Sequence, residues 1–401
     1  MSARYVARQP IFDRAMVVVG YELLYRARAS GPADVDDDDS ATFSVLYGTL
    51  IELGLDSAVD QARAWINVTP QLLTDGGHRI IDATRVVLEL LETAEPSPRL
   101  AQLMRDLTAE GYTLALDDFV LGTGRDELLD LVTIVKLELP AIPAGELAAH
   151  IAAVRRPGMT VLVEKVETVA QYAEALAGGA DLFQGFFFTR PQVLSTQSIP
   201  VGLQAVYAVL AKVNDPHMGL AELSNLVATD VTLAQKVMQS VNSGFVALHQ
   251  RVDSVHQAVV LLGAEGVRQL VTLLVMADAT GKPAELSRQA LIRGEMSAEL
   301  MGVGGSGISR ADREAAFTIG LMSTLDAFTD TPLAEIAARL SLTDRLYDAL
   351  VHHTGPLGQA LMTTLDYERD ALDDDASDAA MAAYVAAVRR ADLRWTSVTT
   401  H

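Results

Sequence analysis

The first half of the sequence contains a series of short apolar runs, and nearly every run ends in a polar residue that recurs at a steady interval. The polar residues are Glu22, Asn67, Glu89, Asp117 with Asp118, Lys136, Glu164 and Gln184. From Asn67 onward the gaps are 22, 28, 19, 28 and 20 residues, about the length of one strand, one helix and two short loops. Polar groups gathered at successive strand ends are typical of a (β/α) barrel with a functional site on one rim.

The runs are rich in Val, Ile, Leu and Phe and lack strict alternation with polar residues, which suits parallel strands buried on both faces. We expect strands over residues 16–24, 64–69, 85–92, 112–119, 133–139, 160–166 and 181–188. Helix-like segments separate them, such as residues 97–111, which begin with a Ser-Pro cap and end at Gly111. This βαβα order predicts an α/β TIM-like barrel rather than a doubly wound sheet.

The pattern changes at residues 190–201, after which amphipathic helices follow with almost no strand signal. Apolar residues recur there at intervals of three and four, and Gly, Pro and Asp-containing turns separate the helices. A glycine-rich break lies at residues 303–308. Because 401 residues are many for one core, we predict two domains, a barrel over residues 1–193 and an all-α domain over residues 198–401.

The composition excludes several classes of protein. There is no Cys for disulfides or thiol chemistry, and a formal net charge of −21 disfavours binding to duplex nucleic acid. No uninterrupted apolar run reaches the roughly 18 residues of a membrane span, since Glu265 and Arg268 interrupt the richest stretch, and the N-terminus lacks the apolar core of a signal peptide. The acidic run Asp36–Asp39 is typical of a solvated loop. We therefore expect a cytoplasmic protein without a membrane partner.

The residue types at the strand ends indicate a particular chemistry. Carboxylate and amide oxygens suit hard cations such as Mg²⁺, Mn²⁺ or Ca²⁺. Asp117 and Asp118 together can offer one carboxylate to each of two neighbouring ions, and Lys136 on the next strand can hold a phosphate oxygen or a metal-bound water. A carboxylate-rich two-metal site with a lysine is suited to phosphodiester hydrolysis.

The barrel half resembles the EAL family of cyclic di-GMP phosphodiesterases over roughly residues 4–193. Seven ordered elements carry the resemblance, with Leu23 in place of the Ala of the name-giving motif. The elements are Glu22-Leu23-Leu24-Tyr25-Arg26, Asn67-Val68-Thr69, Glu89-Leu90-Leu91-Glu92, Asp117-Asp118-Phe119, Lys136-Leu137-Glu138, Glu164-Lys165-Val166-Glu167 and Gln184-Gly185-Phe186.

The resemblance implies a role for each of these polar residues. Glu22, Asn67, Glu89 and Asp117 would be ligands of one metal ion. Asp118 would bind the second ion, Glu164 would be a ligand or a base, and Lys136 would orient the hydrolytic water. Arg26 would contact a phosphate of the dinucleotide, Gln184 would bind water or ligand, and Glu92 and Glu167 would support the site. The implied cofactor is Mg²⁺ or Mn²⁺, with Ca²⁺ inhibitory, and the implied assembly is a homodimer formed through the barrel.

Three departures from the EAL pattern surround this ligand set. The loop after Asp118 reads Val120-Leu121-Gly122-Thr123-Gly124-Arg125, where the family has GTGYSS. Glu138 replaces an Asp, and Lys165 replaces a Gly beside Glu164. Glu92 is retained and would tether the altered loop. An intact ligand set with changed supporting residues fits either a weak hydrolase or a receptor that binds the nucleotide without cleaving it.

The helical half resembles the HDOD domain, a relative of HD phosphohydrolases without their metal site. The resemblance lies in residues 228–243, 254–263 and 316–326. Ser323-Thr324 stand where an HD enzyme carries its His-Asp doublet, and these hydroxyls cannot replace a metal-binding pair. His352 and His353 are adjacent on an expected helix and diverge by about 100°, so they are poorly placed to share one ion.

The order EAL then HDOD resembles a group of two-domain bacterial signalling proteins. The resemblance implies that the helical half is a non-catalytic regulatory module for a protein partner. Three hypotheses remain for the barrel, namely hydrolysis of cyclic di-GMP, binding of cyclic di-GMP as a receptor, and a scaffold that has lost the ligand. The complete set of strand-end residues argues against the scaffold.

Overall fold

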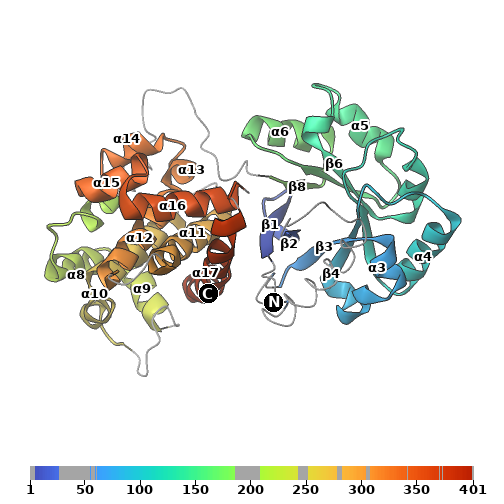
Figure 1. Ribbon diagram of the computed structural model, residues 1–401. Coiled ribbons are helices and arrows are strands. Elements are labelled where there is room, and N and C mark those ends of the chain that lie inside the picture. The colour runs from blue at the N-terminus through green and yellow to red at the C-terminus, as the bar shows by residue number, and fades with distance from the viewer. Residues whose placement is uncertain are drawn as a thin grey trace. The chain divides into compact units, whose positions relative to one another are not determined.

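The computed structural model describes residues 5–26, 55, 59, 61–185, 208–242, 252–277, 282–303, 308–340, 342–369, 371–372 and 374–399. The chain divides into two compact units, residues 1–188 and residues 189–401 (Figure 1). The predicted domain boundaries at residues 193 and 198 lie outside the described residues, as do Asp36–Asp39 and residues 304–307 of the glycine-rich break. These boundaries stay a prediction.

The first unit is a closed eight-stranded barrel, as the spacing of the strand ends predicts. Strands β2 to β8 are parallel to one another, whereas β1 is antiparallel to both of its neighbours, β2 and β8. The strands are β1 (Tyr5–Asp13), β2 (Val18–Arg26), β3 (Arg63–Val68), β4 (Val86–Leu90), β5 (Thr113–Leu116), β6 (Ile134–Glu138), β7 (Thr160–Glu164) and β8 (Leu182–Gln184).

The sequence pattern misses strand β1. Arg8, Gln9 and Pro10 interrupt its apolar residues, so the segment YVARQPIFD does not read as a buried strand. Ile11 and Phe12 are nevertheless fully buried. The register pairs Gln9 with Glu22 and Ile11 with Gln184, so β1 closes the barrel between the strands that carry those two site residues.

Helices cover the outside of the barrel, and side chains cap the N-terminal ends of three of those described, α3, α4 and α6. They are α3 (Pro70–Thr74), α4 (Pro98–Ala109), α5 (Leu147–Val154) and α6 (Val169–Gly178), with short 3₁₀ turns η1 (Gly77–Ile80), η2 (Ala83–Arg85), η3 (Asp126–Leu131) and η4 (Leu139–Ala141). Ser97 caps α4 by accepting a hydrogen bond from the Leu100 amide at 3.1 Å, which confirms the predicted start. Thr168 and Gln171 form a capping box at the start of α6.

Apolar side chains fill the interior of the barrel below the strand ends. The buried cluster comprises Ile11, Trp65, Val87, Ala115, Ile134 and Leu162, from six different strands. Gly20 has room for no side chain, since a Cβ there would lie 2.2 Å from the Trp65 indole nitrogen. This packed apolar layer lies beneath the polar residues at the carboxyl ends of the strands, which is the end of such a barrel where functional sites are found.

The described part of the second unit contains helices and no strands, as expected for an HDOD-like domain. Its elements are α8 (Leu220–Thr229), α9 (Val231–Ser240), α10 (Val255–Ala277), α11 (Ala284–Val303), α12 (Arg310–Met322), α13 (Leu325–Thr329), α14 (Leu333–Ala337), α15 (Asp344–Val351), α16 (Gly355–Glu368) and α17 (Asp374–Thr399). One core cluster joins α8, α9 and α10 through residues such as Leu223, Val237 and Leu270.

Helix α10 is long and apolar enough to cross a membrane by length and composition, with a mean hydropathy of 1.7 over Val255–Met276. Its packing is that of a core helix, because 56% of this window is buried inside the unit. Gly263 has φ 68° and ψ 172°, which interrupts the helix near its middle. The two charged residues of the stretch are used internally, since Glu265 accepts a hydrogen bond from Thr318 and Arg268 donates to the carbonyl of Val213.

Candidate functional site

The strand ends of the barrel bring the predicted polar residues into one buried cluster. Glu22 comes from β2, Glu89 from β4, Lys136 from β6 and Glu164 from β7, and Asp117 directly follows β5. The register places Asn67 opposite Glu89 and Glu138 opposite Glu164. Glu22, Glu89, Asp117, Lys136, Glu164 and Gln184 are all buried despite their polar or charged side chains. Burial of so many charges in one place requires mutual pairing or a ligand.

The ammonium group of Lys136 lies at the centre of this cluster and is only 1% exposed. Its Nζ is 2.7 Å from Glu89 Oε1, 2.7 Å from Asp117 Oδ1 and 2.9 Å from Glu164 Oε1. Glu22 Oε2 lies further away, at 3.5 Å. Four carboxylates from four repeats of the barrel therefore surround one positive charge, and negative charge is in excess.

The amide side chains of Gln184 and Asn67 belong to the same cluster, where both donate to Glu22. Gln184 Nε2 donates to Glu22 Oε2 at 2.5 Å, and Asn67 Nδ2 donates to Glu22 Oε1 at 3.3 Å. Several buried oxygens have no hydrogen-bond partner among the described residues, namely Asn67 Oδ1, Glu89 Oε2 and Gln184 Oε1, whereas Glu89 Oε1 lies 2.7 Å from Lys136 Nζ. Buried acceptors without donors are costly, and a cation is the kind of group that satisfies them.

The pKa values of the cluster reflect this excess of negative charge. Burial raises the pKa of Glu89 well above its usual value, and the neighbouring Lys136 only partly offsets it. Burial likewise raises the pKa of Glu164 to about 8, again against the opposing charge of Lys136. Burial alone would lower the pKa of Lys136, but the surrounding carboxylates raise it well above the usual value. A bound divalent cation would relieve the carboxylates of this unfavourable burial.

Asp118 extends the cluster towards solvent. One oxygen from each of Asp117, Asp118 and Glu164 lies within 4.8 Å of the others, which is a spacing that a metal ion can bridge. Asp118 has φ 41°, a left-handed conformation that costs on the order of 1 kcal/mol for a residue other than glycine. The next residue, Phe119, anchors the turn because its amide donates to the Lys136 carbonyl at 3.0 Å. Burial, and after it the charge of Asp117, raises the pKa of Asp118.

These side chains fit a hard divalent cation. The donors are carboxylate and amide oxygens, which Mg²⁺, Mn²⁺ and Ca²⁺ accept and which softer metals do not prefer. Three of the residues carry buried oxygens without a hydrogen-bond partner, and these oxygens belong to three neighbouring or facing strands. In the part of the chain that the structure describes, Asp117, Asp118 and Glu164 form the single group of three acidic or histidine side chains close enough to share an ion.

Arg125 is a structural residue of this site that the sequence pattern does not reveal. It lies in the altered loop, yet its guanidinium is buried and donates to three main-chain carbonyls, those of Asp117 at 3.0 Å, Leu90 at 3.3 Å and Leu91 at 3.1 Å. Burial lowers the pKa of Arg125, while the charge of Glu92 acts in the opposite direction. Arg125 thus fastens the ends of β4 and β5, which carry Glu89 and Asp117.

The remaining predicted residues lie around the cluster. Glu138 and Lys165 form an ion pair at the rim, with Lys165 Nζ 2.7 Å from Glu138 Oε1. Glu92 and Glu167 are exposed, and the Glu167 amide donates to Gln171 Oε1 at 2.9 Å. Arg26 is the last residue of β2, and its side chain lies outside the described part of the structure, as does Phe186. The roles assigned to these residues stay predictions.

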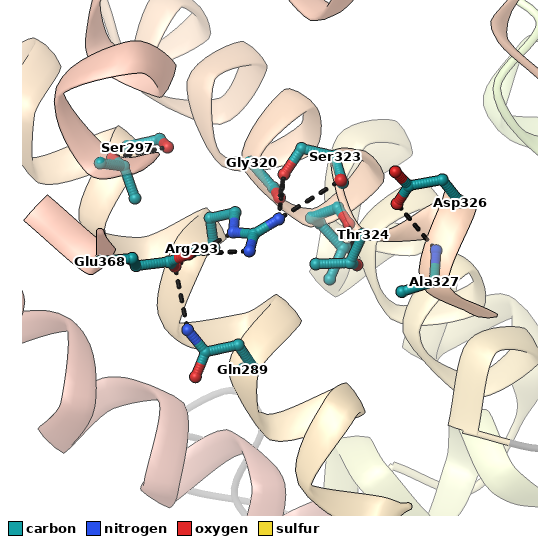
Figure 2. A network of polar contacts seen from close by, with 11 residues as sticks. Gln289, Arg293, Ser297, Gly320, Ser323, Thr324, Asp326, Ala327 and Glu368 are labelled. Carbon is teal, nitrogen blue, oxygen red and sulfur yellow. Dashed lines mark hydrogen bonds and ion pairs between the residues drawn. The ribbon is translucent and has the colours of Figure 1, made fainter. Parts of the chain in front are cut away.

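In the helical unit, a largely buried ion pair lies beside Ser323 (Figure 2). Arg293 of α11 donates to both carboxylate oxygens of Glu368, at 3.1 and 2.8 Å, and Gln289 donates to the same carboxylate at 3.0 Å. The other side of the guanidinium contacts the hydroxyl of Ser323 at 3.1 Å. The neighbouring Thr324 hydroxyl donates to the Leu321 carbonyl at 2.8 Å.

The two adjacent histidines do not share a helix, which corrects the expectation. His352 caps the C-terminal end of α15, and His353 follows it with φ 56°. Burial lowers the pKa of His353, which favours its neutral form.

Comparison with known proteins agrees with this architecture. The model of the EAL domain matches residues 4–191, and the model of the HDOD domain matches residues 199–329. A protein of Vibrio cholerae, named cyclic di-GMP phosphodiesterase CdgJ, is 31% identical over 372 residues, covering 92% of this chain and 84% of the relative. The chain belongs to the EAL–HDOD family. A second relative of similar coverage is YuxH of Bacillus subtilis, an uncharacterised protein that is 27% identical over 89% of this chain and 88% of its own.

Solved structures also match the EAL half. One is Klebsiella pneumoniae BlrP1 in a complex with manganese and cyclic di-GMP, at 22% identity, with a TM-score of 0.39, 46% of this chain and 54% of that chain covered. Another is a standalone EAL protein of Vibrio cholerae O395 with bound cyclic di-GMP, at 20% identity, with a TM-score of 0.38, 46% of this chain and 90% of that chain covered.

Proposed function

We propose that this EAL–HDOD protein is a metal-dependent phosphodiesterase that hydrolyses cyclic di-GMP to the linear dinucleotide pGpG. The observation that carries the proposal is the contact of Lys136 Nζ with the carboxylates of Glu89, Asp117 and Glu164. Asp118 lies beside this cluster, and the side-chain amides of Asn67 and Gln184 donate to Glu22 within it. The name of the relative CdgJ supports the choice of substrate.

Each residue would have a defined part in the reaction. Glu22, Asn67, Glu89 and Asp117 would hold one Mg²⁺ or Mn²⁺ ion, Asp118 would hold a second, and Glu164 would be a ligand or a base. Bound ions of this kind polarise the phosphoryl group and activate water. Ca²⁺ would occupy the same oxygens and inhibit, because its coordination is longer and more flexible.

Lys136 and Glu164 would carry the protein's own part of the hydrolysis. Lys136 would orient the attacking water, and Glu164 would accept the proton that this water loses. The water oxygen forms a new bond to phosphorus, the bond to the ribose 3′ oxygen breaks, and that oxygen takes up a proton to give the linear product. Arg26 would contact a phosphate of the dinucleotide, and Gln184 would fix a water or the ligand.

The alternative of a receptor without turnover rested on the altered loop, and Arg125 weakens that argument. The loop departs from GTGYSS, yet its Arg125 fastens the strand ends that carry Glu89 and Asp117. Arg125 therefore supports the metal-ligand residues in place of the family's GTGYSS loop. The HDOD domain would be the regulatory module, with a protein partner, and we further propose a cytoplasmic protein that forms a homodimer through the barrel.

The decisive experiment measures pGpG formation by the full chain in Mg²⁺ or Mn²⁺, with cyclic di-GMP binding measured in Ca²⁺ alongside. We expect metal-dependent product from the wild-type protein and none from Glu22→Gln. Binding without product would establish a receptor, and the absence of both would leave the barrel as a scaffold.

A further inference from the structure

A second lysine lies at the mouth of the acidic cluster. Lys165 directly follows Glu164 at the end of β7, and Glu138 ends the neighbouring strand β6, where it lies in register with Glu164. Lys165 Nζ lies 2.7 Å from Glu138 Oε1. The lysine side chain is 58% exposed and the glutamate side chain 25%, so the pair is at the surface of the site rather than in its interior.

Lys165 has a backbone conformation that is unfavourable for a lysine, which indicates that its side chain has a role at this position. Its φ of 54° is left-handed, a conformation that glycine adopts freely and that costs another residue on the order of 1 kcal/mol. The EAL pattern has a glycine at this position and an aspartate at the position of Glu138. The two departures therefore meet in one ion pair, and the longer carboxylate of Glu138 reaches the new ammonium.

The charges around the mouth show what this ammonium can do. An anionic phosphodiester needs positive charge beside the acidic residues of this site, which are Glu22, Glu89, Asp117, Asp118, Glu164 and Glu138, and the proposed metal ions would supply only part of it at the mouth. Lys136 cannot supply the rest to an incoming ligand, because it is 1% exposed and surrounded by four of those carboxylates. Among the residues that the structure describes at this rim, Lys165 is the cation that faces solvent. An ammonium has three N–H donors, and Glu138 takes one of them.

We propose that Lys165 binds a phosphate oxygen of the cyclic dinucleotide at the mouth of the site and that Glu138 is its positioning residue. This inference rests on the proposed function and adds a substrate contact that the EAL pattern lacks. Lys165 directly follows Glu164, whose carboxylate lies within 4.8 Å of those of Asp117 and Asp118, so the lysine is at the side of the cluster where a phosphoryl group would meet the metal ligands.

The first test compares Lys165→Met with wild type in the full chain. Lys212→Met, an exposed lysine of the helical unit, is the matched control. We expect the dissociation constant for cyclic di-GMP in Ca²⁺ and KM in Mn²⁺ both to rise about tenfold, as for a lost charge-assisted hydrogen bond at a partly exposed site. We expect kcat to change by less than about threefold, Lys165→Arg to restore most of the affinity, and Lys212→Met to have no effect.

A metal titration separates this role from an effect on the ions. The number of Mn²⁺ ions bound to the full chain should be the same for wild type and Lys165→Met. Unchanged nucleotide affinity in Lys165→Met, or a changed Mn²⁺ stoichiometry that accounts for the loss, would overturn the phosphate contact. Either result leaves wild-type turnover intact, so it does not overturn the proposed function. A wild-type protein that binds no cyclic di-GMP would overturn both.

The part played by Glu138 is tested by a double-mutant cycle. If Glu138 positions the ammonium, then Lys165→Met should weaken nucleotide binding less in a Glu138→Ala background than in wild type. The factor by which it raises the dissociation constant should be about threefold smaller in that background. Strictly additive effects of the two substitutions would show that Lys165 acts without Glu138.

Discussion

Lys136 Nζ lies 2.7 Å from Glu89 Oε1, and both side chains are almost completely removed from solvent. The same ammonium contacts Asp117 and Glu164. Lys136 therefore has two roles. It is the counter-ion of the buried carboxylates, and it is the group proposed to orient the attacking water. The predictions for the barrel follow from this double role.

Replacement of Lys136 by Met should make the metal-free protein less stable and more dependent on divalent cations. Loss of the ammonium leaves buried carboxylates without their partner, which costs about 3–5 kcal/mol in the free energy of unfolding. We expect a lower melting temperature in a chelator, and a larger rise on addition of Mn²⁺ than in wild type. Lys212→Met serves as the control. Equal Mn²⁺-induced shifts in Lys136→Met and wild type would contradict the central position of Lys136.

The stability of the metal-free barrel should fall as the pH rises. The pKa of Glu164 is about 8 in the folded protein against 4.5 as the ordinary value, so the folded state holds this proton more tightly than the unfolded state. The associated stability is present below about pH 4.5 and is lost between pH 4.5 and 8. Thermal unfolding in a chelator, recorded across this range, measures the slope, and Glu164→Gln should flatten it.

The same titration predicts the opposite trend for metal binding. Metal ligands must lose their protons, so the melting-temperature shift caused by Mn²⁺ should grow over the pH range in which the metal-free protein becomes less stable. A constant shift from pH 5 to pH 8 would argue against Glu164 as a ligand.

Replacement of Arg125 by Met should weaken metal binding without removing any ligand. The guanidinium donates to the carbonyls of Asp117, Leu90 and Leu91, and its loss leaves these buried acceptors unsatisfied. We expect about a tenfold weaker apparent affinity for Mn²⁺ in turnover assays and about 2 kcal/mol less stability. Arg105→Met, an exposed substitution on α4, is the matched control. Wild-type metal affinity in Arg125→Met would show that the altered loop does not support the site.

Replacement of Arg293 by Met should destabilise the helical unit by about 3 kcal/mol, since Glu368 keeps a buried charge without its partner. The double substitution Arg293→Met with Glu368→Leu should recover much of this loss. The two tryptophans of the chain, Trp65 in the barrel and Trp395 in α17, allow the units to be followed separately. Denaturation monitored by fluorescence in a Trp65→Phe background therefore reports the helical unit. A loss no smaller in the double variant than in Arg293→Met would contradict the pairing.

The polar strand ends predicted the barrel because each strand delivers one side chain to the same rim at a fixed interval. Strand β1 could not be found in this way, since Arg8, Gln9 and Pro10 interrupt its apolar residues and its direction is antiparallel. The sequence likewise gives Lys136 a place on a strand but not four carboxylate neighbours, which depend on how the barrel closes.

The supporting residues were harder to predict because they act through long-range contacts. Arg125 stands in a loop that departs from the family pattern, and two of the three carbonyls it binds, those of Leu90 and Leu91, are 35 and 34 positions away, as only the folded chain reveals. Glu138 and Lys165 looked like two separate departures. Opposite charges at the ends of adjacent parallel strands were the signal that could have joined them.

The Arg293–Glu368 pair means that the two halves of the chain differ in what they must obtain from their surroundings. In the helical domain, the guanidinium of Arg293 balances the carboxylate of Glu368 without any added ion. In the barrel, one ammonium faces four carboxylates, and the proposed metal ions would supply the missing positive charge. If the barrel works as proposed, a shortage of divalent cations would stop hydrolysis of cyclic di-GMP and leave the helical domain unchanged. A partner of the kind proposed for that domain would then still bind, in a state without enzymatic output.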